Sequence, residues 1–236
     1  MIMRINFTEI PAPLLKESYL LGEPWMFYIF IFIGVLIAGT QWNYSKNIRE
    51  IFYAVINIRM LREILREEIV LTSRTSQLLI VLSHLSLALF FYLSFSYYEI
   101  GIAGVSLSGF LKYLLILTIL TFIYFVKIVI IRGMRLLFNG DYSLREYEFN
   151  YGLLLKVAGI GLFPLSLLLA YSKVIPSDFL VLIGLILIVA SIVWRWARGW
   201  LNAVTNRISI VYIILYLCTL EILPAVVLLK VLLVRS

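Results

Sequence analysis

The sequence contains a single cysteine, Cys218, and a single histidine, His84. One cysteine excludes a disulfide within the chain, and one histidine excludes a haem held by two histidines or a histidine-rich metal site. The chain also lacks a glycine-rich phosphate-binding loop and a His-Glu-x-x-His motif. We therefore expect no cofactor, no metal and no catalytic residue, and the sequence favours a protein that is not an enzyme.

Charge is also scarce. Only 14% of the residues are charged and 63% are hydrophobic, whereas a soluble domain has about 25% charged residues. Such a chain could not cover its surface in water, and its apolar runs approach the roughly 20 residues that a membrane-spanning helix needs. Because a helix satisfies its own backbone hydrogen bonds in lipid, we predict an all-α polytopic membrane bundle of about six transmembrane helices. The predicted spans are Trp25–Thr40, Gln77–Tyr98, Phe110–Ile131, Tyr151–Tyr171, Phe179–Trp194 and Ile208–Leu233.

The net charge of +7 does not indicate nucleic-acid binding, because the basic residues follow membrane topology. Three connections between the spans hold 12 of the 20 basic residues: Lys46, Arg49, Arg59, Arg62, Arg66, Arg74, Arg132, Arg135, Arg145, Arg195, Arg198 and Arg207. Cytoplasmic loops carry such an excess of Lys and Arg. The rule predicts that these connections are cytoplasmic and that both termini lie on the other side.

The domain organisation is simple. We predict that residues 1–24 form a non-cytoplasmic N-terminal arm, which lacks the pattern of a signal peptide, and that residues 25–236 form a single transmembrane helical domain. Within it, residues 43–76 form a cytoplasmic amphipathic connection, because apolar residues recur every three or four positions from Ile48 to Val70. This helix is either a simple connector along the membrane surface or a surface for docking a partner. The residues expected to dock a partner are Arg59, Arg62, Glu63, Arg66 and Glu67.

Four polar residues within the spans form the candidate site. A carboxylate in the middle of a span, such as Glu221, costs about 2.5–3.5 kcal/mol on insertion scales. Lys127 and Lys156 each lie about five residues, or about 7 Å, from the cytoplasmic end of their spans. His84 lies at a depth of about 10 Å and Glu221 at about 16–20 Å.

These depths suggest that Glu221 pairs with Lys156 or Lys127, or forms a hydrogen bond with His84. Alternatively, a protonated Glu221 makes one structural hydrogen bond, or Glu221 contacts another subunit. Each lysine could also extend its ammonium group to the interface. Pro164 and Pro224 predict helix breaks, because proline cannot donate to the carbonyl four residues earlier.

Three segments carry a resemblance to a known family: Leu61 to Ser76, Glu148 to Gly159 with Pro164, and above all the motif Leu217-Cys-Thr-Leu-Glu-Ile-Leu-Pro224. From about Trp25 onward, the chain resembles a domain-of-unknown-function family of polytopic inner-membrane proteins from the Bacteroidetes lineage. The resemblance implies a bacterial inner (cytoplasmic) membrane. In that membrane, the basic connections predict that both termini are periplasmic. The resemblance implies no activity, cofactor or partner.

Three functions remain open at this point. The first is a non-enzymatic integral subunit or scaffold of a cell-envelope complex, surrounded by the lipid bilayer and contacting a protein partner or another copy of itself. The second is a small transporter or proton-coupled subunit that uses Glu221 with His84, Lys127 and Lys156. The third, with the least support, is an intramembrane enzyme acting on lipid.

Overall fold

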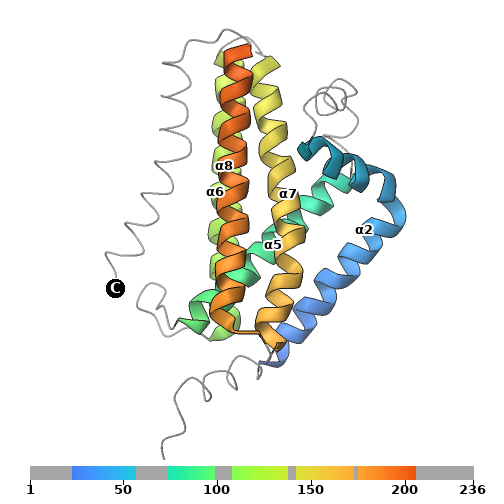
Figure 1. The fold of residues 1–236 in the computed structure, drawn as a ribbon, viewed down its shortest axis with the longest axis vertical. Helices are drawn as coiled ribbons and strands as arrows, with labels where there is room; N and C mark the ends of the chain where they lie inside the picture. Colours follow the sequence, from blue (N-terminus) through green and yellow to red (C-terminus); the bar gives the residue numbers. More distant parts are fainter. Residues whose placement is uncertain (1–22, 57–73, 99–107, 138–141, 173–174, 206–236) are drawn as a thin grey trace, which may run out of the picture.

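The protein is a bundle of long helices (Figure 1). The computed structural model describes residues 23–56, 74–98, 108–137, 142–172 and 175–205. In this part of the chain, the regular structure is entirely α-helical, which confirms the predicted fold class. The helices are α2 (Pro24–Ile56), α5 (Arg74–Tyr97), α6 (Gly109–Leu137), α7 (Tyr142–Tyr171) and α8 (Ser177–Thr205).

All five helices are long and apolar enough to cross a membrane. The apolar segments of α5 and α6 begin or end within two residues of the predicted spans, at Ser76–Tyr97 and Gly109–Gly133. That of α7 begins at Glu146, five residues earlier than predicted, and that of α8 continues to Arg198. The predicted sixth span lies outside the described residues, and so does the N-terminal arm up to residue 22.

Helix α2 is longer than its apolar run. The predicted span ended at Thr40, but α2 continues through the polar sequence after Trp42 and ends at Ile56, with a length of 33 residues. Figure 1 shows that α2 changes direction in its second half. The beginning of the expected cytoplasmic connection is therefore helical and continuous with the first span. Residues 57–73, which include the proposed docking residues, lie outside the described part.

Helices α5 and α7 form the centre of the bundle and make the most extensive helix contact. Small residues explain how closely they approach. A Cβ atom at Gly159 of α7 would overlap the Cα of Ser83 in α5, so a side chain at residue 159 would separate the two backbones. Close approach of this kind is the main use of glycine at helix interfaces in membranes.

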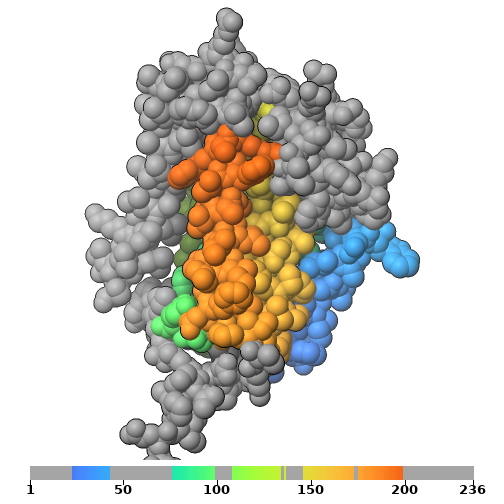
Figure 2. Space-filling view, viewed as in Figure 1, coloured from blue at the N-terminus to red at the C-terminus, as the bar shows by residue number. Residues whose placement is uncertain are grey.

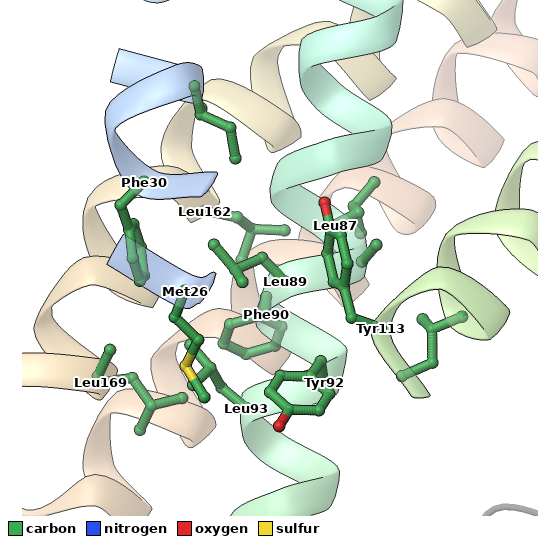
Figure 3. Close-up of a cluster of buried hydrophobic side chains, with 14 of the residues drawn as sticks. Met26, Phe30, Leu87, Leu89, Phe90, Tyr92, Leu93, Tyr113, Leu162 and Leu169 are labelled. Carbon is green, nitrogen blue, oxygen red and sulfur yellow. The ribbon is translucent and has the colours of Figure 1, made fainter. Parts of the chain in front are cut away.

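Large apolar side chains fill the space around this crossing. Phe90 and Leu93 of α5 and Leu162 of α7 are fully buried, and Met26 and Phe30 bring α2 against them (Figure 3). Pro164 lies inside α7 without ending it. In place of the expected break, the proline removes one backbone donor from a helix that continues to Tyr171.

Helices α2, α6 and α8 lie at the periphery. At most 22% of the apolar segment of each is buried, compared with 61% for α5 and 50% for α7. Their outer faces carry large apolar side chains, such as Phe32 on α2, Phe122 on α6 and Ile186 on α8. Figure 2 shows α8, α7 and α2 side by side on one face of the molecule. In a membrane, these faces contact lipid or another apolar helix.

Candidate functional site

Several buried polar residues, among them Lys127, Glu146 and Asn150, lie near the first turns of α7 and the end of α6. The centre of this region is Tyr151 of α7, whose ring is stacked on Tyr124 of α6 with the ring centroids 5.8 Å apart. His84 of α5 packs against the other ring, Tyr124, with an edge-to-face geometry at 4.9 Å. A line of three rings therefore connects α5, α6 and α7.

Two cations pack on the same tyrosine. The Nζ of Lys127 in α6 lies 4.5 Å from the centroid of the Tyr151 ring, and the Cζ of Arg195 in α8 lies 5.1 Å from it. A cation on an aromatic ring gains about 0.5–2 kcal/mol, more when water is excluded. We refer to His84, Tyr124, Lys127, Tyr151 and Arg195 as the cation–aromatic cluster. It joins the four helices α5 to α8.

His84 is oriented by its own helix. Its Nδ1 lies 2.8 Å from the carbonyl oxygen of Ile80. Because a carbonyl can only accept, Nδ1 carries the proton in this contact, and Nε2 is the nitrogen left for another partner. The side chain is buried, with 7% exposed, so His84 lies inside the bundle.

Lys156 lies one turn further along α7 than Tyr151 and faces α5. Its Nζ donates a hydrogen bond of 2.6 Å to the Oγ of Ser76, and only 4% of the side chain is exposed. The ammonium group therefore points into the bundle instead of extending to the interface. Ser76, at the start of α5, was not among the expected site residues, because nothing in the sequence links it to a residue 80 positions later.

A second polar group lies nearer the end of the bundle. Arg198 of α8 donates through Nη1 to the Oδ1 of Asn150 in α7 at 3.2 Å, and its guanidinium group lies 5.7 Å from the Trp194 ring. Closer to the surface, Arg132 of α6 forms an ion pair of 3.0 Å with Glu148. These residues fix the ends of α6, α7 and α8 relative to one another.

The sequence analysis counted Arg195 and Arg198 among the basic residues of a connection between two spans. In the structure, both arginines contact α7 across the helix interface. Arg195 packs on the ring of Tyr151, and Arg198 donates to the neighbouring residue, Asn150. In the sequence, only the presence of Asn150 and Tyr151 near the beginning of an apolar run indicated that α7 could bind these arginines.

The candidate site predicted from the sequence is thus partly brought together. His84 and Lys127 join the same cluster through the two tyrosines, while Lys156 bonds to Ser76. Glu221 and Pro224 lie outside the described residues. Among the described residues, no group of three or more His, Cys, Asp and Glu side chains could hold a metal ion.

The fold and this site define a class of protein, a multi-pass helical membrane protein whose core is tied together by buried cations and aromatic rings. The chain belongs to a family described as "Domain of unknown function (DUF4271)", which matches residues 26–232. This confirms the resemblance to a family of unknown function. No curated protein and no solved structure matches the chain.

Proposed function

We propose that this protein is a non-enzymatic integral subunit or scaffold of a cell-envelope complex in a bacterial inner membrane. The observation that supports this proposal best is the use made of the buried polar residues. The cation–aromatic cluster joins four helices, and Lys156 joins α7 to Ser76 of α5. Polar contacts of this kind hold helices in a fixed arrangement, as a scaffold requires.

The outer surfaces suit such a role. α6 and α8 both have 17% of their apolar segments buried. Phe122 of α6 and Ile186 of α8 are 66% and 57% exposed. A helix of a partner or of a second copy could pack on either face in place of lipid, because packing and not hydrophobic transfer drives helix association in membranes.

Photocrosslinking in intact cells tests the proposal. A photoreactive phenylalanine analogue replaces Phe122, Ile186 or Phe32, and the fully buried Phe90 serves as the control position. We expect a discrete adduct with one protein from one helix face only, still present after purification in mild detergent. Adducts with lipid alone at all three exposed positions, with the protein recovered alone, would contradict a scaffold role.

A second function, a small transporter or proton-coupled subunit, has one observation in its favour. His84 is connected through Tyr124 and Tyr151 to Lys127, so titratable side chains follow one another across three helices. Together with Lys156 and Glu221, they would carry a proton or bind a charged substrate. Proton flux in vesicles containing the purified protein tests this reading. A flux that His84→Gln abolishes would favour it, and vesicles no more permeable than protein-free ones would exclude it.

A further inference from the structure

The surface of the bundle changes from apolar to polar at one level on three helices. Arg132 of α6 forms an ion pair with Glu148 of α7 at 3.0 Å, and Arg198 of α8 donates to Asn150, two residues further along α7, at 3.2 Å. These contacts place the polar ends of α6, α7 and α8 at the same height in the bundle. Because the heights come from contacts, they do not depend on how far each helix is tilted.

The exposed side chains change in kind at this level. On the side toward the middle of the spans, Val129 of α6 and Val193 of α8 are exposed. At the level itself, the exposed side chains are Arg132 of α6, with 61% exposed, and Trp194 and Trp196 of α8. Tryptophan is enriched where the hydrocarbon core of a bilayer meets the headgroups, and arginine near the end of a span extends its charged group toward them. The pattern therefore indicates where α6 and α8 leave the hydrocarbon.

Helix α2 indicates a boundary of the same kind. Its apolar segment, Pro24–Trp42, ends at a tryptophan whose side chain is 89% exposed. At 1.5 Å per residue this segment is about 27 Å long, and α8 covers about 26 Å from Ser177 to Trp194. Both lengths are close to the hydrocarbon thickness of about 30 Å. Beyond Trp42, α2 continues in polar sequence and changes direction (Figure 1).

We propose that the headgroup layer of one leaflet meets the bundle at a ring of exposed side chains, the headgroup ring, formed by Trp42, Arg132, Trp194 and Trp196. Phospholipid headgroups fit this surface, because indole rings are amphipathic and a guanidinium group matches the geometry of phosphate. Arg132 bonds to Glu148 through Nε, and a guanidinium group has further donors on its two terminal nitrogens. The ring would fix the height of the bundle in the bilayer.

This placement puts the cation–aromatic cluster in one half of the bilayer. Arg195 lies between the two tryptophans of α8, at the level of the headgroup ring. His84 packs on Tyr124, which precedes Arg132 by about 12 Å along α6. The cluster therefore covers less than half of a core about 30 Å thick, and a proton path through it would need further groups to reach the opposite surface. The placement itself is independent of the scaffold role.

Depth measurements with a spin label test the headgroup ring. In a Cys218→Ala background, single cysteines carry the label at Trp42 and Trp196, and at the exposed positions Val35 and Ile186 as matched controls on the same two helices. The accessibility of each label to oxygen and to a water-soluble nickel complex gives its depth in vesicles. From the helical rise, we expect the controls to lie about 8–15 Å deeper than the ring positions. Equal depths within either pair, or a ring position deeper than its control, would overturn the proposal.

Brominated phospholipids provide a second measurement that needs no substitution. Three of the five tryptophans belong to the headgroup ring, so bromine near the glycerol end of the acyl chains should quench the native fluorescence more than bromine near the chain ends. The purified protein is reconstituted without any other protein, so that a partner of another kind cannot cover the ring. Stronger quenching by bromine near the chain ends would contradict the proposal, even if the labelled variants do not fold.

Discussion

The contact between Gly159 and the backbone of Ser83 makes a sharp prediction about the core. Replacing Gly159 with alanine would place a Cβ atom on the Cα of Ser83, so α5 and α7 must move apart along their largest shared interface. Inserting a methyl group into a well-packed core costs about 1–3 kcal/mol. Because the obstacle is backbone, no rotamer change can relieve it.

Gly152 provides the matched control. It is a buried glycine in the same helix, two turns earlier, and a Cβ atom there meets nothing within 4 Å. Both substitutions gain the same helix propensity, about 1 kcal/mol, so the difference between the two variants isolates the clash. We expect Gly159→Ala to melt roughly 2–12 °C below Gly152→Ala, from about 2–4 °C for each kcal/mol in a chain of this size.

Thermal unfolding of the purified protein in mild detergent, followed by size-exclusion chromatography, measures this difference. Adding Ser83→Ala to Gly159→Ala should not restore stability, because the Cα of residue 83 remains in place. Equal melting temperatures for the two glycine variants, or full rescue by Ser83→Ala, would refute the argument that the backbones meet at this crossing.

Three further substitutions test other contacts by the same assay. Ser76→Ala should lower the free energy of unfolding by about 1–3 kcal/mol, because it removes the acceptor of the buried Lys156 ammonium group. Adding Lys156→Met should recover most of that loss. If the effects of the two substitutions simply add, the hydrogen bond is contradicted. Gly184→Ala should destabilise the protein, because its Cβ would overlap the buried ring of Phe90. Adding Phe90→Leu should relieve part of this effect. A double variant no more stable than Gly184→Ala would disprove the overlap. Arg132→Ala should lower the free energy of unfolding by less than about 1 kcal/mol, because the Arg132 side chain is 61% exposed in its ion pair with Glu148. A larger loss would show that the pair is not a surface contact.

The spans could be predicted from the sequence because bilayer thickness imposes a minimum length on every apolar run. The boundaries were less certain where polar residues continue a helix. α2 extends beyond Trp42 because the water–membrane boundary does not end a helix, and α7 begins before its apolar run for the same reason. The hydropathy of the sequence indicates which residues can lie in lipid. The ends of a helix depend instead on backbone hydrogen bonding, which can continue into polar sequence.

The candidate site was predicted only in part. His84, Lys127 and Lys156 stood out because charged or titratable groups are rare inside spans. Their partners Ser76, Tyr124 and Tyr151 did not, since serine and tyrosine are common in apolar helices and gain a role only from what lies opposite. Arg195 was assigned to a connection because it directly follows Trp194, the end of the predicted span, and basic residues are common beside spans.

By itself, the sequence determined that this is a helical membrane protein, because its composition permits neither a water-covered surface nor an unpaired backbone in lipid. It also determined which residues would be costly to bury. Only the tertiary structure decided that α5 and α7 are central and that Lys127 and Arg195 meet at Tyr151. The physical reason is that hydropathy depends on each residue alone, whereas the choice of a partner depends on which faces of two helices pack together.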